Sequence, residues 1–246
     1  MIALSSWTSA TLDLLLPAVC PACQIASGPG CCPACLAVMP AIPNPCPWCG
    51  APGRAPAEEN SGEPEADCPA CRNAGLPGIA SVVVVWHYTG LLAHLVGEAK
   101  ACSRPAAVAA LAELMPAVIE SRLDDPGPWT VVPIPASGRR PGPHLGTALA
   151  RMVAGRSGLP LRSYLATTRA TAAQHGLNLA DRARNVASLF RIIGRPSPGV
   201  VLVDDLLTSG ATAVAAARAL RGAGAKRVVL VCLARTPRRR ERTTAD

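Results

Sequence analysis

The stretch that most constrains this chain runs from Val200 to Leu220 and reads VVLVDDLLTSGATAVAAARAL. A short apolar run, Val200–Val203, ends in two adjacent acids, and an alanine-rich segment with helical spacing follows soon after. Because the run is continuously apolar rather than alternating, it predicts a strand buried on both faces, as in a parallel sheet. The stretch therefore predicts a strand, an acid pair, a loop and a helix, in that order.

The loop of this stretch combines small hydroxyl side chains with glycine. Such residues let backbone N–H groups approach a phosphate, and the N-terminus of the following helix adds a positive dipole. Adjacent carboxylates just before the loop suit the neighbouring hydroxyls of a ribose, or a divalent cation. We interpret the stretch as a ribose 5-phosphate pocket, with an ordinary strand–turn–helix as the alternative. Its residues are the acids Asp204 and Asp205 and the loop Thr208, Ser209, Gly210, Ala211 and Thr212.

A second feature is a cluster of cysteines near the N-terminus. Nine of the eleven cysteines lie between residues 20 and 71, and eight of them form four Cys-x-x-Cys pairs. Each such turn presents two thiolates to one tetrahedral metal, so four turns predict two closed structural zinc sites. Pairing in sequence order gives two zinc ribbons; interleaved pairing, disulfides and a redox pair are alternatives, and Cys31 is expected to be no ligand. The ligands are Cys20, Cys23, Cys32, Cys35, Cys46, Cys49, Cys68 and Cys71.

Changes of composition divide the chain into parts. Residues 1–19 are expected to form a short amphipathic helix, and residues 20–78 the double zinc ribbon. Within the ribbons, residues 51–67 are rich in proline and acids without apolar periodicity, which predicts a flexible insert. Residues 79–236 form the larger second domain, and residues 237–246 a basic flexible tail.

Charge and hydropathy limit the possible partners. The formal net charge is +8, which permits phosphate ligands or nucleic acid as partners and demonstrates neither. No apolar run reaches the ~18 residues that a membrane-spanning helix needs. No basic segment precedes the leucines near the N-terminus, so we expect no signal peptide and a cytoplasmic protein.

The second domain alternates strands and helices, which predicts an α/β fold. Besides Val200–Val203, strands are expected at Ser81–Trp86, Thr130–Ile134, Pro160–Leu165 and Arg227–Leu233, the last with a buried Cys232. Helices are expected at residues 91–100, at residues 105–123 with a break at Pro116, and at residues 145–154.

Basic and polar side chains near these elements are further candidate ligands. Lys100 ends a predicted helix, where it could meet a phosphate or lie in solvent. Arg139 and Arg140 follow a predicted strand; their guanidinium groups match diphosphate oxygens, and solvated loop arginines are the alternative. Residues 167–192 are long and polar at their start, which predicts a mobile loop that closes over the site. Its candidate ligands are Arg169, Gln174, Arg182 and Asn185.

The order of these motifs resembles the ComF family of bacterial phosphoribosyltransferase-like proteins. The motifs are the Cys-x-x-Cys turns, H-Y-x-G from His87, V-P-I-P from Val132 and V-D-D-x-x-T-[ST]-G-x-T from Val203. The resemblance implies a double zinc ribbon followed by a type I phosphoribosyltransferase domain, a parallel sheet flanked by helices. It also implies Mg²⁺-dependent pentosyl transfer from phosphoribosyl diphosphate and a link to DNA uptake. A non-catalytic accessory that binds single-stranded DNA or proteins, and a nucleobase-salvage enzyme, are the alternatives.

The sequence departs from the family at one loop. The family usually has R-x-R-G-F-N-Q after V-P-x-P, whereas this chain has Pro141, Gly142, Pro143, His144 and Leu145 after its arginines. The resemblance therefore supports the ribose 5-phosphate site more strongly than the diphosphate site, and we expect His144 only to begin a helix. Some purine-using relatives have an acid in the phosphate loop where this chain has Thr208, so the loop supplies no base.

Overall fold

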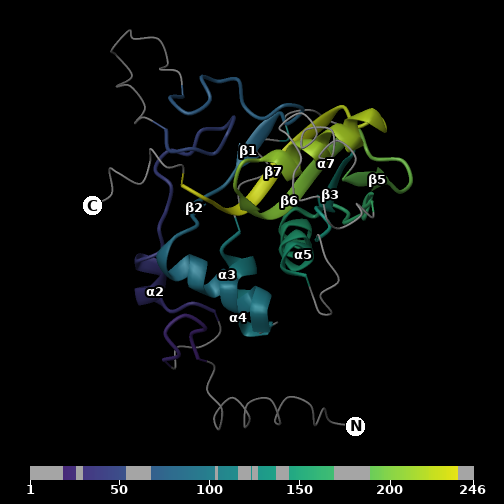
Figure 1. The fold of residues 1–246 in the computed structure, drawn as a ribbon. Helices are drawn as coiled ribbons and strands as arrows, with labels where there is room; N and C mark the ends of the chain where they lie inside the picture. The colour runs from purple at the N-terminus through teal and green to yellow at the C-terminus, as the bar shows by residue number, and fades with distance from the viewer. Residues whose placement is uncertain are drawn as a thin grey trace, which may run out of the picture.

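The fold is taken from a computed structural model of the chain (Figure 1). The structure describes residues 19–25, 30–53, 68–102, 105–115, 123, 127–136, 144–168 and 189–237. The predicted N-terminal helix, apart from its last residue, therefore lies outside the described residues. So do most of the acidic insert and all but the first residue of the basic tail.

A parallel sheet forms the centre of the molecule. Its strand order is β1 (Ser81–Val83), β7 (Arg227–Arg235), β6 (Gly199–Leu207) and β3 (Trp129–Pro133), and β2 (Trp86–His87) also pairs with β7. Every pairing in this sheet is parallel. The predicted α/β architecture is thus confirmed.

Helices cover both faces of the sheet (Figure 1). One core cluster joins the sheet to α3 (Gly90–Cys102), α4 (Pro105–Glu113) and α5 (Leu145–Ser157). The other joins it to α7 (Ala211–Gly222). No helix among the described residues is both long and apolar enough to cross a membrane.

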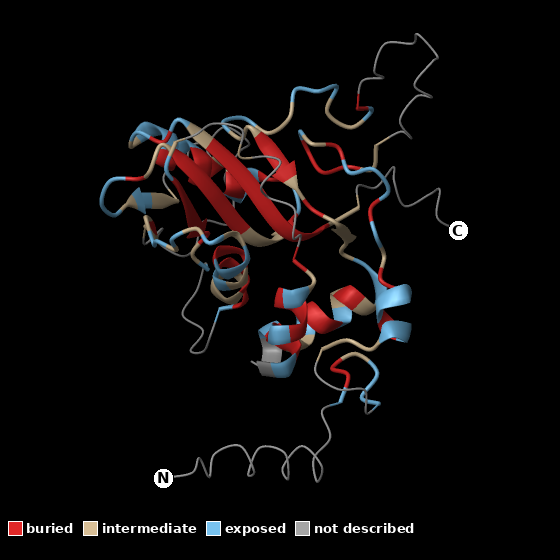
Figure 2. Ribbon diagram, turned by 180° about the vertical axis from the view of Figure 1, so that it is seen from behind, coloured by how far each residue is buried: buried red, intermediate tan, exposed pale blue. Residues whose placement is uncertain are grey.

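The middle of β6 is buried on both sides, as its continuous apolar run predicts. Val201 and Val203 belong to the core beneath α3, α4 and α5, whereas Val200 and Leu202 belong to the core beneath α7. Successive strand residues point to opposite faces, which explains this alternation. Figure 2 shows the resulting buried stripe through the central strands.

Residues 81–86, predicted as one strand, form two. The chain leaves the sheet at Val84 and Val85, between β1 and β2. There the carbonyl of Val85 accepts a hydrogen bond from the Ile42 amide at 2.7 Å, and Ala41 bridges to Trp86. The N-terminal cysteine region therefore takes backbone bonds that a continuous strand would use.

The strand predicted at residues 160–165 is misplaced. In that segment only Leu161 bridges to β3, opposite Val131. The actual strand, β4 (Leu165–Thr167), begins at the last predicted residue and pairs antiparallel with β5 (Phe190–Ile192). Proline lacks the amide proton that a strand would donate, which limits pairing at Pro160.

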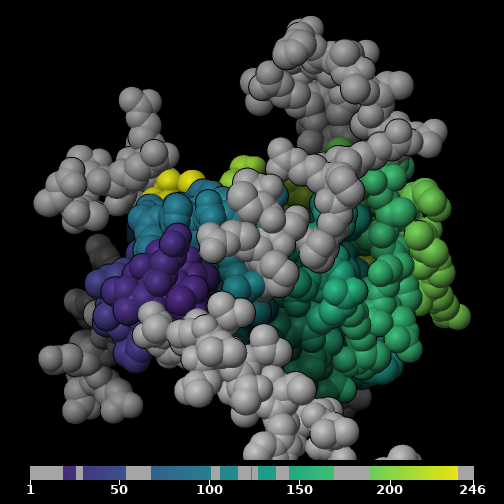
Figure 3. All heavy atoms as spheres, turned by 90° about the horizontal axis from the view of Figure 1, so that it is seen from below, coloured from purple at the N-terminus to yellow at the C-terminus, as the bar shows by residue number. Residues whose placement is uncertain are grey.

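Helix α4 ends at Glu113, shortly before Pro116, as the predicted break requires. A short helix, α2 (Pro33–Ala37), lies within the cysteine-rich region. Seen from below, the purple residues of this region lie beside the blue and teal residues that follow them in the chain (Figure 3).

Candidate anion site and metal centres

The acid pair lies within a strand rather than after it. Strand β6 continues to Leu207, so Asp204 and Asp205 occupy its carboxyl-terminal part, with Asp204 opposite Cys232 of β7. The amide of Asp205 donates a hydrogen bond to Oδ1 of Asp204 at 2.9 Å. Both side chains are partly buried, so the strand presents two carboxylates at the sheet edge where ligands of such folds bind.

Lys100 forms an ion pair with this acid pair. Its ammonium, at the end of α3, lies 2.6 Å from Oδ2 of Asp205; the two side chains are 39% and 18% exposed. Helix α3 shares a core with β6, so this ion pair joins the end of the helix to the end of the strand. The structure thus brings one predicted phosphate ligand to the acid pair, where it neutralises one of two like charges.

The surroundings of Asp204 perturb its ionisation. Burial, and then the negative charge of Asp205, raise the pKa of Asp204 to about 7, against the lowering effect of its hydrogen bond and of Lys100. Burial and the two nearby acids also raise the pKa of the Cys232 thiol, which is fully buried as predicted. Near neutral pH, Asp204 therefore gains or loses its proton easily.

The loop after β6 leads directly into a helix N-terminus. Thr208 and Ser209 are exposed, and Gly210 caps α7 with a left-handed φ of 79°. The Ser209 hydroxyl accepts a hydrogen bond from the Ala211 amide at 3.3 Å, and the N-cap residue, Gly210, has no side chain that could cap the other amides of α7. The remaining first-turn N–H groups, with Thr212 exposed among them, are suited to an anion.

Gly210 is also required by close packing. A Cβ at this position would lie 2.9 Å from Cδ2 and 3.2 Å from Cδ1 of Leu76. Sequence reasoning missed Leu76, because a single leucine in an irregular segment gives no periodic signal.

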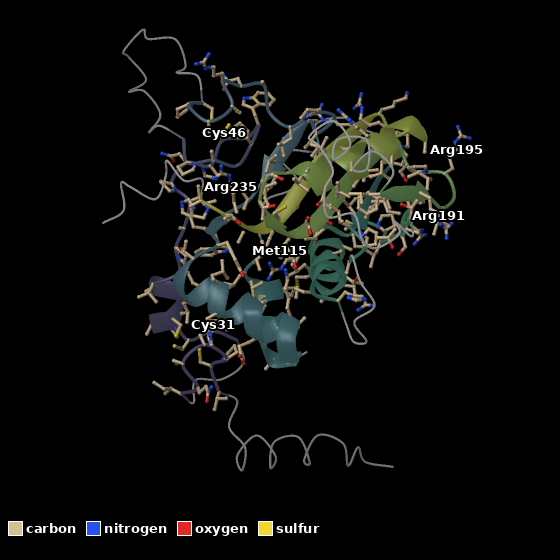
Figure 4. The ribbon with its side chains drawn as sticks, viewed as in Figure 1. Cys31, Cys46, Met115, Arg191, Arg195 and Arg235 are labelled. Atoms are coloured by element: carbon tan, nitrogen blue, oxygen red, sulfur yellow. The ribbon has the colours of Figure 1, made fainter. Side chains whose placement is uncertain are left out.

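A second residue missed by the sequence analysis is Arg235. Strand β7 was predicted to end at Leu233 but continues to Arg235, which lies opposite Leu207 and is only 1% exposed. Figure 4 labels it at the end of β7. A buried arginine at this sheet edge could have been suspected because it directly follows an apolar run.

The other predicted ligands fall outside the described residues. These are Arg139, Arg140, Arg169, Gln174, Arg182 and Asn185. The structure describes the preceding strands, β3 and β4, and His144, which begins α5 without a side-chain capping bond, as expected.

The cysteines gather in two tetrads at separate places, near the labels Cys31 and Cys46 in Figure 4. In each tetrad the four Sγ atoms lie within 4.8 Å of one another; Cys23 and Cys32 are 3.8 Å apart, as are Cys49 and Cys68. A tetrahedron with Zn–S bonds of about 2.3 Å has sulfur–sulfur edges of about 3.8 Å. The first cysteine cluster is Cys20, Cys23, Cys32 and Cys35, and the second is Cys46, Cys49, Cys68 and Cys71.

This grouping confirms pairing in sequence order and excludes the interleaved one. Cys31 lies outside both clusters, and the cysteines whose side chains the structure describes are free rather than in disulfides. Burial raises the pKa of the Cys20 thiol, but backbone hydrogen bonds from Cys32 and others lower it to about 6. Backbone hydrogen bonds likewise lower the pKa of Cys68 against its burial. Burial raises the pKa of three other ligands, Cys35, Cys46 and Cys49. The fit of both clusters to zinc therefore rests on the close grouping of four sulfur atoms in each.

Comparison with known proteins agrees with this architecture. The family model described as "Phosphoribosyl transferase domain" matches residues 102–246. The chain is 32% identical over 235 residues to the DNA utilization protein YhgH of Salmonella typhi, covering 91% of this chain and 99% of that protein. The Salmonella typhimurium protein of that name is 31% identical over the same length, and that of Escherichia coli K12 is 44% identical over 71 residues, 28% of this chain and 31% of that protein.

The chain therefore belongs to the family of proteins with a phosphoribosyltransferase domain, and the ComF resemblance drawn from its motifs is confirmed.

Proposed function

We propose that this protein binds phosphoribosyl diphosphate at the carboxyl end of β6 and transfers its pentosyl group. One observation carries the proposal: a helix N-terminus whose N-cap is the left-handed Gly210, which has no capping side chain, follows a strand end with two carboxylates. Phosphate and ribose are the two chemical groups that these features suit, and their spacing in the chain is that of one ribose 5-phosphate site.

Each part of the site has a separate role in binding. The loop from Thr208 to Thr212 holds the 5-phosphate through backbone N–H groups and hydroxyls. Asp204 and Asp205 accept hydrogen bonds from the ribose hydroxyls, which requires their ionised forms. Lys100 offsets part of the acid pair's charge when the site is empty. The loop supplies hydroxyls and no carboxylate, so it positions the phosphate and gives no general base.

The reaction is displacement of diphosphate from the anomeric carbon through an oxocarbenium-like state. Catalysis then rests on neutralising charge on the leaving group rather than on a covalent intermediate. Mg²⁺, when bound with the diphosphate, supplies part of that neutralisation. The remaining residues are assigned from the sequence: Arg139 and Arg140 contact the diphosphate, while Arg169, Gln174, Arg182 and Asn185 close over it.

A second candidate is a non-catalytic role in DNA uptake. It is favoured by the name of the two relatives that align over nearly the whole chain, "DNA utilization protein". In this case the pocket binds a sugar phosphate without turnover, and single-stranded DNA or partner proteins are the physiological ligands. The same name supports a DNA-linked role for the catalytic protein.

Calorimetric titration with phosphoribosyl diphosphate and Mg²⁺ tests the site. We expect the double variant Asp204→Asn/Asp205→Asn to bind at least about tenfold more weakly, because it loses the carboxylate acceptors. Glu113→Gln, an acid on α4, is the matched charge control and should bind as the wild type does. Full affinity in the double variant would overturn the site assignment.

Diphosphate release against a panel of nucleobases and amines separates the two functions. Release with one acceptor class supports transfer. Binding without release from any acceptor, together with salt-dependent affinity for single-stranded DNA, supports the accessory role.

A further inference from the structure

The second cysteine cluster lies directly against the sheet edge that carries the acid pair. Gly50, which follows its first Cys-x-x-Cys turn, has a left-handed φ of 68°. A Cβ there would lie 2.5 Å from Cγ1 of Val84 and 3.6 Å from Cδ2 of Leu207, the last residue of β6. The turn therefore packs on the sheet with no space for a side chain.

Backbone hydrogen bonds fix the same turn to the sheet. The carbonyl of Pro47, inside the first Cys-x-x-Cys turn, accepts a hydrogen bond from the Val82 amide of β1 at 2.7 Å. The Ala80 amide donates to Val228 of β7 at 2.8 Å. The cluster and the parallel sheet are thus parts of one packed unit.

The segment after the second Cys-x-x-Cys turn connects the cluster to the phosphate loop. A Cβ at Gly75 would lie 3.1 Å from the carbonyl of Trp48, so this segment packs back on the first turn. The next residue, Leu76, provides the atoms closest to the position of a Cβ on Gly210. Contacts therefore run without a break from the cluster through Leu76 to the N-terminus of α7.

The first cysteine cluster has different neighbours. Ala22 and Cys31 pack on the core beneath α3, α4 and α5, on the other face of the sheet from α7. A Cβ on Gly30 would lie closest to Oε2 of Glu113 on α4, at 3.1 Å. The two clusters thus offer an internal comparison, since they share ligand chemistry but contact opposite sides of the molecule.

We propose that Leu76 is a positioning residue for the phosphate loop, and that a metal in the second cluster holds Leu76 in place. The cluster's own core consists of Cys46, Cys49, Cys68 and Ala51, which is too little apolar surface to order these turns without a metal. Metal binding at the second cluster and phosphate binding at the loop are then coupled, and by linkage each strengthens the other equally. The phosphate half of this coupling rests on the proposed function.

Amide hydrogen exchange of the ligand-free, zinc-loaded full chain tests the positioning role. We expect the amides of residues 208–214 to exchange at least about fivefold faster in Leu76→Ala than in the wild type. Ile79→Ala is the matched control, because Ile79 is also partly buried against the same core but is not among the nearest neighbours of Gly210. Equal exchange in the two variants would overturn the role of Leu76, whatever the ligand is.

Zinc affinity, measured by competition with a chromophoric chelator, tests the coupling. In Cys32→Ser/Cys35→Ser only the second cluster retains four thiolates, and ribose 5-phosphate should raise its zinc affinity about fivefold or more. In Cys68→Ser/Cys71→Ser the first cluster remains, and the same ligand should leave its zinc affinity unchanged. Adding Leu76→Ala to the first variant should remove the ligand effect.

The outcomes separate this proposal from the proposed function. Ribose 5-phosphate that binds by calorimetry but leaves the zinc affinity of the second cluster unchanged overturns the coupling. An absence of ribose 5-phosphate binding in the wild type contradicts the proposed function, while hydrogen exchange in Leu76→Ala still decides whether Leu76 orders the loop.

Discussion

The two cysteine clusters have the same ligands and differ in what surrounds them. Each consists of two Cys-x-x-Cys turns whose four sulfur atoms lie within 4.8 Å of one another. In the first cluster Cys23 is exposed, and the nearby side chains of Ile25 and Val38 are 67% and 68% exposed. In the second, Cys46, Cys49 and Cys68 are all buried. Identical metal chemistry therefore serves a peripheral module in one case and the central domain in the other.

This difference shows that the contacts of a metal site, rather than its ligands, decide what it stabilises. The second cluster shares packing and hydrogen bonds with β1 and the phosphate loop. The first packs on the helical layer of the opposite face. Loss of either cluster should disorder its own Cys-x-x-Cys turns, but only loss of the second should expose the edge of the sheet.

The largest expected effect comes from disrupting each cluster separately. Cys49→Ser/Cys68→Ser should lower the free energy of unfolding of the whole domain by at least about 3 kcal/mol, because the buried turns lose their metal and leave β1 uncovered. Cys23→Ser/Cys32→Ser should lower the free energy of unfolding clearly less, because the region of the first cluster can open locally. Urea unfolding followed by circular dichroism measures both, and equal losses would contradict the comparison.

Two glycines provide a gentler test, because both have left-handed φ but different neighbours. Gly50→Ala should cost about 3 kcal/mol, since backbone strain adds to a clash with Val84 in the core. Gly30→Ala should cost only about 1 kcal/mol, because its nearest neighbour is the movable end of Glu113. Thermal unfolding of the two variants at one pH gives the difference in stability between them. A larger loss of stability for Gly30→Ala than for Gly50→Ala would contradict the expected order.

In contrast to the variants above, a variant that removes the Asp204 carboxylate should stabilise the ligand-free protein. The folded-state pKa of Asp204 is raised above its unfolded value, so its contribution to stability is full below about pH 4 and is lost as pH rises through about 7. Asp204→Asn should therefore stabilise the ligand-free protein at pH 8 by about 1–2 kcal/mol and give no such gain at pH 4. The difference in free energy of unfolding between variant and wild type, measured from pH 4 to 8, isolates the contribution of Asp204. A gain in stability that grows toward low pH would contradict the raised pKa.

The smallest effect is expected at Lys100. Its ion pair with Asp205 is partly exposed, so Lys100→Met should cost only about 0.5 kcal/mol at moderate salt, and less at high salt. The same variant should raise the pKa of Asp204 further, because it removes a positive charge that lowers it. Titration of Asp204 by carbon-13 NMR checks the direction, and an unchanged pKa would show that the ammonium does not act on the pair.

Much of the local structure could be predicted from the sequence. The unbroken apolar run before Asp204 predicted a strand buried on both faces, and the small residues after it predicted a loop that leads into a helix. Cys-x-x-Cys spacing predicted two four-sulfur clusters, with pairing in sequence order and interleaved pairing both open. Each of these signals depends on residues close together in the chain, where backbone geometry limits what the side chains can reach.

Other features were misjudged because distant segments compete for the same backbone groups. The break between β1 and β2 follows from a hydrogen bond between Ile42 and Val85, far apart in sequence. The strand predicted at residues 160–165 begins later in the chain, at Leu165, because its partner strand, β5, is distant in sequence. Both errors concern pairing partners, which local propensity does not specify.

The sequence by itself determined the chemical parts of this protein: the carboxylates of β6, the small hydroxyl and glycine residues of the loop after it, and the eight thiols of the Cys-x-x-Cys turns. Only the tertiary structure decided which parts touch. It brought Lys100 of α3 to Asp205, and it packed Leu76 of the second cluster's segment against Gly210. The physical reason is that the chemistry of each side chain follows directly from its residue type. A contact between two elements depends instead on how both of them pack on the same sheet.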